Sequence, residues 1–241
     1  MDTKKILCEF FPDERIFLSK NKRLIILMGS FADFDSFEYS QQLSAQAKKL
    51  DDLSVYLILI GIGNEKSKEL FCKFNNLDTK KVFVVENAEL HKQLNLNPGF
   101  VSPMPAIVNL MMMCAGINSR GTIKEVLRGY YGDKNAKSLF AFNDDINLGP
   151  FSIFKGNMFD VFSKKNILRP FELATRRLMN MIEILSHWKT YVPYPAFLTQ
   201  RGATILLNEK DEVLYKFICK SLLLYSRDMN TPLSFLDSSL D

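Results

Sequence analysis

The first hundred residues alternate short apolar runs with segments of helical pattern, and this alternation constrains the fold most. The apolar runs cover residues 23–28, 54–60 and 81–85. Strands that are apolar throughout are buried on both faces, and the helices between them serve as crossovers between parallel strands. The order β-α-β-α-β-α therefore predicts an α/β domain whose mostly parallel sheet is covered by helices on both faces.

Three helices are predicted to alternate with these strands, over residues 37–50, 65–75 and 87–94. Asp35 or Ser36 is a suitable N-cap for the first helix, because a short polar side chain can accept a hydrogen bond from a backbone N–H of the first turn. Asn64 is the expected cap of the second helix for the same reason.

The second half is predicted to be mainly helical before the chain returns to the sheet. Further helices are expected over residues 106–117, 121–130, 171–188 and 218–225. The tetrad 208–211 joins two apolar strands, 203–207 and 213–217, which predicts a β-hairpin. Residues 133–169 give no clear pattern, and the polar tail 230–241 is expected to fray unless Phe235 and Leu236 dock.

A chain of 241 residues fits a single domain. We expect one domain over residues 1–241, with its core formed by 20–97 and 190–225. Residues 98–189 are then a helical insertion. The hairpin adds antiparallel strands to the three parallel ones, so the predicted architecture is a three-layer sandwich around a central mixed sheet.

The net charge of +4 is too small to indicate a nucleic-acid partner. The positive excess lies in the second half, because residues 116–201 carry thirteen basic and seven acidic residues. This distribution indicates a solvated basic face, or alternatively a docking surface for an acidic partner or an anionic membrane.

Several classes of protein are not supported by the sequence. The N-terminus lacks the apolar stretch of a secretory signal, and no apolar run approaches the length of a membrane span. The four cysteines form no C-x-x-C pair or zinc spacing, and with only two histidines we expect no metal site. Gly61 and Gly63 follow a strand, but Lys66 stands where a dinucleotide motif has its third glycine, so we expect no cofactor. Four cysteines in such a pattern favour a reducing, intracellular compartment.

The turn after the first strand, residues 31–39, is where this type of fold would place reactive chemistry. Backbone N–H groups and the helix dipole at a helix N-terminus lower the pKa of a thiol and favour the nucleophilic thiolate. The turn reads Phe-Ala-Asp-Phe-Asp-Ser-Phe-Glu-Tyr and contains no cysteine.

The turn and four other stretches resemble the AhpC/TSA-like, peroxiredoxin-like proteins, and more narrowly a subgroup from cyanobacteria and plastids. The resemblance extends over about residues 20–236 and lies in residues 27–39, 60–63 with 71–72, 113–116, 125–129 and 199–202. It implies a thioredoxin-like fold, an antioxidant family and a link to photosynthesis.

The resemblance also implies that the usual active-site cysteines are missing. Redox-active relatives carry F-G-C-x-x-C in the turn; Phe31-Ala32 matches its first two residues, so Asp33 and Ser36 fall on the two cysteine positions. Neither side chain can form a sulfenate or a disulfide. Asp33, Asp35, Ser36 and Glu38 are therefore interpreted as a degenerate active-site turn without a confident catalytic residue.

Two cysteines and two arginines remain as candidates outside the turn. Cys72 and Cys114 are expected to pack in the core, with a displaced redox thiol as the alternative. Arg201 precedes the hairpin, so it is expected to pair with Asp33 or Asp35, or alternatively to bind an anion. Arg128 is likewise expected either to form an ion pair or to bind an anion. The methionines around Met111 serve as core filler or as an adaptable interface.

Three functions are compatible with these features. The first is a non-catalytic thioredoxin-like module, a pseudoenzyme that binds a protein partner and acts in assembly or protection of a photosynthetic membrane complex, in the cytoplasm or the plastid stroma. Peripheral membrane association fits this role, and no nucleic acid is expected. The second is a thiol peroxidase or oxidoreductase that uses Cys72 or Cys114. The third is a small-anion or cofactor binder near Asp33 and Arg201.

Overall fold

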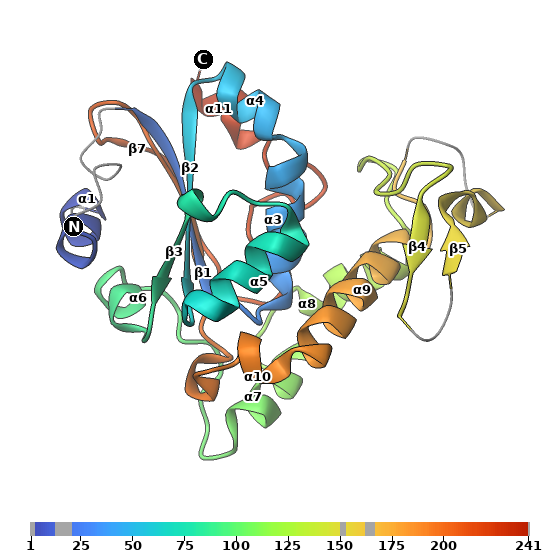
Figure 1. The fold of residues 1–241 in the computed structure, drawn as a ribbon, viewed down its shortest axis with the longest axis horizontal. Coiled ribbons are helices and arrows are strands. Elements are labelled where there is room, and N and C mark those ends of the chain that lie inside the picture. Colours follow the sequence, from blue (N-terminus) through green and yellow to red (C-terminus); the bar gives the residue numbers. More distant parts are fainter. Residues whose placement is uncertain (1–2, 13–20, 150–152, 162–166, 241) are drawn as a thin grey trace.

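The computed structural model describes residues 3–12, 21–149, 153–161 and 167–240. Its centre is a five-stranded sheet with the strand order β3-β2-β1-β6-β7 (Figure 1). β1 to β3 run parallel, and the hairpin of β6 and β7 joins β1 in antiparallel orientation. The strands are β1 (Lys22–Ser30), β2 (Val55–Ile62), β3 (Val82–Val85), β6 (Ala203–Leu207) and β7 (Val213–Ile218). The predicted α/β fold with a central mixed sheet is confirmed.

Helices cover both faces of this sheet because its strands are apolar on both sides. In β1, Leu24 and Ile26 pack into one core, and Ile25 and Leu27 pack into the other. Each core has its own cover, as Figure 1 shows: α3 (Phe34–Ala45), α4 (Ala47–Asp52) and α5 (Glu65–Asn75) on the first, and α1 (Thr3–Phe10) and α6 (Glu89–Gln93) on the second.

The helix after β1 begins earlier than predicted and is interrupted. α3 starts at Phe34 with Asp33 at its N-cap, so the predicted caps Asp35 and Ser36 are wrong and lie inside the first turn. Gln46 leaves helical geometry, with φ −109° and ψ 17°, and divides the predicted helix 37–50 into α3 and α4.

The second crossover helix has its predicted bounds. α5 begins after Asn64, whose side chain accepts a hydrogen bond from the Ser67 N–H at 3.0 Å, while the Ser67 hydroxyl accepts one from the Asn64 N–H at 2.8 Å. This reciprocal capping box satisfies two N–H groups that a helix terminus otherwise leaves without a partner.

The chain between β3 and β6, for whose residues 98–189 we keep the name insertion, packs beside the sheet. Its long helices are α7 (Ala106–Cys114), α8 (Thr122–Tyr131) and α9 (Glu172–Ser186), followed by α10 (Trp188–Tyr191) and the short η3 (Pro195–Phe197). α9 contacts α3 and α8, and Figure 1 shows it running away from the sheet towards a separate hairpin. That hairpin, β4 (Asp145–Asn147) and β5 (Ile153–Lys155), precedes η2 (Gly156–Val161) and occupies the stretch for which no element was predicted.

The C-terminal region differs from its prediction. The expected helix 218–225 is wrong: β7 extends to Ile218, the segment after it is not helical, and Leu223 has a positive φ of 63°. The tail is docked, since Phe235 and Leu236 are buried in the core. The Phe235 ring stacks on Tyr215 with centroids 4.0 Å apart, at the start of α11 (Phe235–Leu240).

His91 is a buried titratable group between α6 and β1. Its Nε2–H donates to the Met28 carbonyl oxygen at 2.6 Å. Burial lowers the pKa of His91 from 6.5 to about 4, outweighing the hydrogen bond to Met28. Between pH 4 and pH 6.5 the unfolded chain binds more protons at His91 than the folded chain does. The contribution of His91 to the free energy of unfolding is therefore complete above about pH 6.5 and is lost as the pH falls towards 4.

Replacing His91 with glutamine is expected to flatten the acid side of the stability profile. The slope of unfolding free energy against pH should differ from wild type by at most one proton, about 1.4 kcal/mol per pH unit. Urea denaturation at a series of pH values from about 4 to 7 measures both slopes. Parallel profiles for the two proteins would show that His91 titrates normally.

In the parts of the chain that the structure describes, no helix is long and apolar enough to cross a membrane.

Candidate functional site

The turn after β1 lies against the loop that enters the hairpin. Gly29, near the end of β1, permits this approach, because a Cβ at that position would collide with the Gln200 carbonyl oxygen. The close packing brings Arg201, next along the loop, to the N-terminus of α3. The sequence-predicted residues Asp33, Asp35 and Arg201 are thereby brought together.

Arg201 and the two aspartates form a buried ion cluster. The Arg201 side chain is 1% exposed. Its Nη1 and Nη2 each lie 3.3 Å from Asp33 Oδ1, and Nη1 lies 3.1 Å from Asp35 Oδ2. Its Nε–H donates to the Thr199 carbonyl oxygen at 3.0 Å. The guanidinium is thus held by carboxylate and backbone oxygens, and an external anion would have to displace the carboxylates.

Further donors complete the coordination of the aspartates. Asp33 Oδ2 accepts hydrogen bonds from the Ser36 hydroxyl at 3.0 Å and the Tyr225 hydroxyl at 2.9 Å. Asp35 Oδ2 also accepts one from the Leu223 N–H at 2.5 Å. Asp35 Oδ1, by contrast, has no hydrogen-bond partner among the described residues.

The electrostatics of the cluster favour a protonated Asp35. Burial and then the charge of Asp33 raise the pKa of Asp35 well above its usual range, although Arg201 and the Leu223 N–H act in the opposite direction. Burial lowers the pKa of Arg201, but the charges of Asp33 and Asp35 outweigh it and raise that pKa overall. One guanidinium between two carboxylates is balanced when one of the carboxylates keeps its proton.

Glu38 and Arg128 belong to a neighbouring set of ion pairs. Glu38 Oε2 accepts from Arg177 Nε at 2.7 Å, which ties α3 to α9. Arg128 Nε lies 2.8 Å from Glu125 Oε2, and its Nη1 lies 3.6 Å from an Asp133 carboxylate oxygen. Arg128 therefore pairs within the insertion and is not part of the Arg201 cluster.

The cysteines differ in accessibility. Cys72 and Cys219 are buried. Burial raises the pKa of Cys72 to about 11, and it raises the pKa of Cys219 well above the usual value. Cys8 is half-buried. The expectation that Cys114 packs in the core is wrong, because it is exposed at the C-terminal end of α7; partial burial and then the charge of Asp35 raise the pKa of its thiol.

Cys114 and Asp35 border the same cavity of about 420 Å³. The cavity lies among α3, α7, α8 and α9, and most of its lining is apolar. A thiol therefore lines the same cavity as Asp35 of the turn 31–39, but it comes from α7 and not from the turn itself. Its raised pKa keeps it in the less nucleophilic thiol form at neutral pH.

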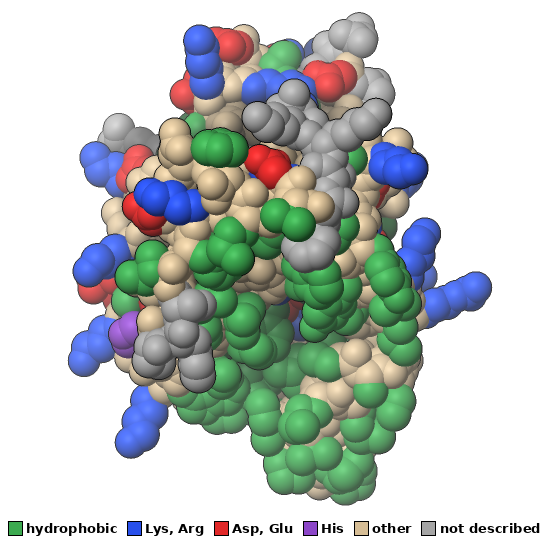
Figure 2. All heavy atoms as spheres, turned by 90° about the vertical axis from the view of Figure 1, so that its right-hand side faces the viewer, with side chains coloured by type: hydrophobic (Ala, Val, Ile, Leu, Met, Phe, Trp, Pro, Cys, Tyr) green, Lys and Arg blue, Asp and Glu red, His purple; other side chains and the backbone are tan. Residues whose placement is uncertain are grey.

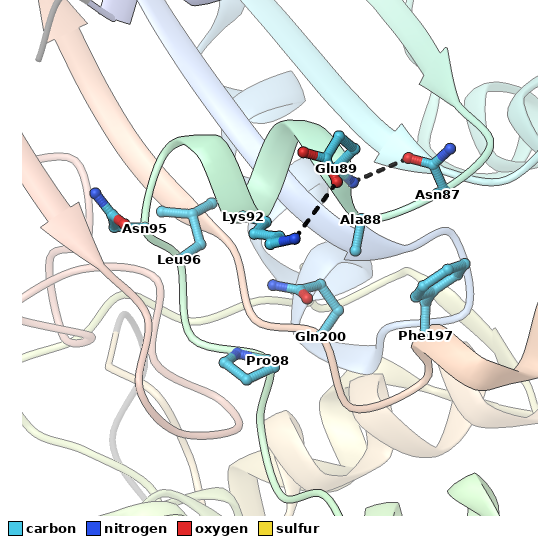
Figure 3. A pocket seen from close by; sticks show the side chains of 9 residues that line it. All are labelled: Asn87, Ala88, Glu89, Lys92, Asn95, Leu96, Pro98, Phe197 and Gln200. Atoms are coloured by element: carbon cyan, nitrogen blue, oxygen red, sulfur yellow. Dashed lines mark hydrogen bonds and ion pairs between the residues drawn. The ribbon is translucent and has the colours of Figure 1, made fainter.

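A second pocket, of about 770 Å³, lies between α6 and the segment that carries Phe197 and Gln200 (Figure 3). Gln200 borders it, while its amide group donates to the carbonyl oxygens of Asn97 and Arg201, each at 2.9 Å. Glu89 and Lys92 lie one turn apart on α6 at its border, with Lys92 Nζ 4.0 Å from Glu89 Oε2. Among the described residues that line this pocket there is no cysteine, so it offers no thiol.

Sequence reasoning missed the partners supplied by distant segments. Tyr225 and Leu223 follow the hairpin and contact Asp33 and Asp35 across separations of 192 and 188 residues. Arg177 reaches Glu38 from the insertion. No local pattern marks these contacts. In the described residues, no group of three or more histidine, cysteine or acidic side chains could hold a metal ion.

Comparison with known proteins supports the family suggested by the sequence. A family model described as AhpC/TSA antioxidant enzyme matches residues 42–221, which is most of the chain. No curated protein and no solved structure matches it. The matched region starts after the turn 31–39 and includes the rest of α3, the insertion and the hairpin. On this match, and with the mixed sheet described above, the chain belongs to the AhpC/TSA antioxidant enzyme family.

Proposed function

We propose that this protein is a thioredoxin-fold member of its family that binds a protein partner and does not carry out thiol turnover at the family's active turn. The observation that carries the proposal is the closed Arg201 cluster. Asp33 and Ser36 occupy the two positions that the resemblance assigns to cysteines, and both are engaged in buried hydrogen bonds. The turn thus has a structural role in this chain.

An exposed apolar surface provides the binding face. Figure 2 shows hydrophobic side chains crowded around a hollow on the side of the molecule that carries the insertion. Met111 is 65% exposed and Tyr131 is 74% exposed. We give the name insertion face to the exposed apolar side chains of α7, α8, α9 and the segments that flank them, which are Val101, Met104, Ile107, Met111, Ile117, Ile123, Leu127, Tyr130, Tyr131, Phe171, Leu178, Met181 and Leu185. Large contiguous apolar surfaces of this kind mark interaction sites.

The charge on this face suggests the nature of the partner. Within residues 98–131 the only acidic residue is Glu125, and it is buried against Arg128. Arg120 and Lys124 are exposed among the apolar side chains. A partner with apolar side chains and an acidic rim complements such a face. Because the sequence resembles cyanobacterial and plastid proteins, we propose that this partner belongs to a photosynthetic membrane complex. The protein would reach the complex from the cytoplasm or the stroma and would be peripheral to the membrane.

Two substitutions on α8 test the partner-binding role. Ile123→Asp combined with Leu127→Asp places two carboxylates on the insertion face, and we expect capture of a specific partner from native lysate to fall about tenfold or more. Val213→Asp, on the edge strand β7, is the matched control because Val213 is similarly exposed but lies away from the insertion. Equal capture by all three proteins, or no specific partner at native abundance, counts against the proposal.

The exposure of Cys114 beside Asp35 keeps an antioxidant activity as the second candidate. If the protein used a displaced thiol, peroxide consumption with a reductant would depend on Cys114 or Cys72. We expect the purified protein and its Cys72→Ser, Cys114→Ser double variant to consume peroxide at the same low rate. A clear loss of rate in the double variant would favour the enzyme over the binding module.

A further inference from the structure

α7 is apolar on the side that faces solvent as well as on the side that faces the protein. Leu110 and Met113 pack into a small core with Leu222. On the solvent side, Ile107 is 41% exposed and Met111 is 65% exposed. The helix reads Ala-Ile-Val-Asn-Leu-Met-Met-Met-Cys and contains no charged residue. A helix that is apolar all round is normally buried, so an apolar environment is expected on the outer side of α7.

The one amide side chain of α7 is turned inwards. Asn109 Oδ1 accepts a hydrogen bond from the Ser102 hydroxyl at 2.5 Å, and its Nδ2 donates to the carbonyl oxygens of Ser102 and Met104, each at 3.4 Å. In α7, all of which the structure describes, the exposed side therefore offers no polar side chain besides the thiol of Cys114. Protein interfaces carry about one hydrogen bond per 100–200 Å², whereas the hydrocarbon of a membrane forms none. The outer side of α7 thus suits lipid better than protein.

The apolar surface continues beyond both ends of α7. Val101 and Met104 are exposed before the helix, and Ile117 is exposed after it. Gly116 lets the end of α7 approach α8, since a Cβ at Gly116 would lie 2.9 Å from Ile123 Cδ1. Figure 1 places α7 at the lower end of the molecule, and Figure 2, turned about the vertical axis, shows hydrophobic side chains covering that end. A surface at one end of the molecule can enter a flat lipid layer without a change in the fold.

The charges beside this apolar surface are basic. Residues 90–124 contain no aspartate or glutamate, and Arg120 and Lys124 are exposed within this stretch. Lys220 is exposed on a neighbouring segment, where the Ser221 hydroxyl donates to the Arg120 carbonyl oxygen at 2.8 Å. An anionic bilayer attracts basic side chains near its surface, and each of them strengthens binding by about fivefold. The charge at this end of the molecule is therefore complementary to anionic lipid.

We propose that the α7 end of the molecule inserts into the surface of an anionic lipid bilayer. We give the name α7 tip to the apolar side chains that enter the bilayer, which are Val101, Met104, Ile107, Met111 and Ile117. They lie at the boundary between headgroups and acyl chains, while Arg120 and Lys124 contact anionic headgroups. This inference deepens the proposed function and rests on it for the position at a membrane; the protein partner keeps the α8 and α9 parts of the insertion face.

Flotation of the full chain with lipid vesicles tests the lipid contact. We expect vesicles of phosphatidylcholine and phosphatidylglycerol to bind the protein about tenfold more tightly than vesicles of phosphatidylcholine alone. Ile107→Asp combined with Met111→Asp should abolish binding to both kinds of vesicle. Arg120→Gln combined with Lys124→Gln should remove the preference for phosphatidylglycerol. Val213→Asp is the matched control, because Val213 is exposed on β7, away from α7, and it should bind as the wild type does.

Two tryptophan variants show which part of the molecule enters the bilayer. Lipids brominated on their acyl chains should quench the added fluorescence of Met111→Trp and leave that of Val213→Trp unchanged. Trp188 is the only tryptophan of the chain and is common to both variants, so the wild type supplies the background. The proposal is overturned by the absence of binding to anionic vesicles, by equal binding to neutral and anionic vesicles, by normal binding of the Ile107→Asp, Met111→Asp variant, or by equal quenching of the two added tryptophans.

The lipid contact and the protein partner can fail separately. The vesicles contain no protein, so binding to them does not depend on the partner. In a detergent extract, where no bilayer remains, the Ile107→Asp, Met111→Asp variant should capture the partner as the wild type does. If this variant loses the partner, α7 contacts protein and the lipid proposal is wrong. If the wild type binds vesicles as expected but captures no specific partner, the proposed function fails and the lipid contact stands.

Discussion

Replacing Arg201 with methionine is expected to lower the free energy of unfolding by about 3–5 kcal/mol, because it leaves Asp33 and Asp35 buried without their cation. The side chains of Asp33 and Asp35 are at most 2% exposed, and both contact the Arg201 guanidinium. Methionine keeps an unbranched apolar stem but lacks the guanidinium, so the loss combines the charge, its hydrogen bonds and the volume of that group. Urea denaturation followed by circular dichroism measures the change.

A triple variant separates charge from packing at this site. Arg201→Met combined with Asp33→Asn and Asp35→Asn removes the guanidinium and both carboxyl groups, and replacing a whole buried ionic group is often neutral. We therefore expect the triple variant to recover most of the stability that the single variant loses. A loss below about 1 kcal/mol in the single variant, as for a surface pair, would contradict the structural role of the cluster.

In our proposal, this cluster also explains how the turn can persist without redox chemistry. In a thiol enzyme the N-terminus of this helix stabilises a thiolate. Here the N-terminus of α3 carries the Asp33 carboxylate. That carboxylate is bound by Ser36 in the first turn of α3, by Arg201 in the hairpin loop and by Tyr225 after the hairpin. The hydrogen bonds of Asp33 connect the end of β1 to the hairpin loop and to the segment that follows the hairpin.

The core of the fold could be predicted because its signals are local. β1, β2 and β3 are apolar at nearly every position, and sheet burial on both faces requires that pattern. Asn64 fixed the start of α5 through its own side chain. The tetrad 208–211 placed the hairpin, since such polar segments between apolar strands form turns.

Other features were not predictable, because distant contacts decide them. The segment 218–225 has an apolar pattern typical of a helix. It is held in a non-helical path where the Leu223 N–H donates to Asp35 and Tyr225 reaches Asp33. Cys114 stands among apolar neighbours in sequence, yet it lies on the outer side of α7 while Met113 is fully buried. The sequence pattern alone does not show which side of α7 faces the core.

The candidate site was predictable only in part for the same reason. Asp33, Asp35 and Ser36 could be singled out by their place in the turn, and Arg201 by its place before the hairpin. The pocket needs α8 and α9, which approach the turn through the Glu38–Arg177 ion pair across 139 residues. An insertion of this length carries no signal in the sequence for where it packs.

Replacing Glu172 with leucine is expected to release the far part of the insertion, with a loss of about 3–5 kcal/mol in unfolding free energy. Glu172 is fully buried at the start of α9. Its Oε1 accepts from the N–H groups of Leu139 and Phe140, each at 2.7 Å, and its two oxygens bind Arg169. The variant leaves these donors and a buried guanidinium with fewer acceptors.

The loss of stability in Glu172→Leu should be local as well as global. The N–H groups of Leu139 and Phe140, which Glu172 accepts from, lie on the segment that leads to the β4–β5 hairpin. Limited proteolysis with mass spectrometry should therefore show new cleavage between residues 139 and 161 in Glu172→Leu. Glu183→Leu is the control on the same helix: it removes one hydrogen bond, from Tyr191 at 3.0 Å, and a weak contact with His187, and should cost about 1 kcal/mol. If both variants unfold alike and are cleaved alike, Glu172 does not anchor the insertion, and the position of α9 beside the pocket must depend on its contacts with α3 and α8.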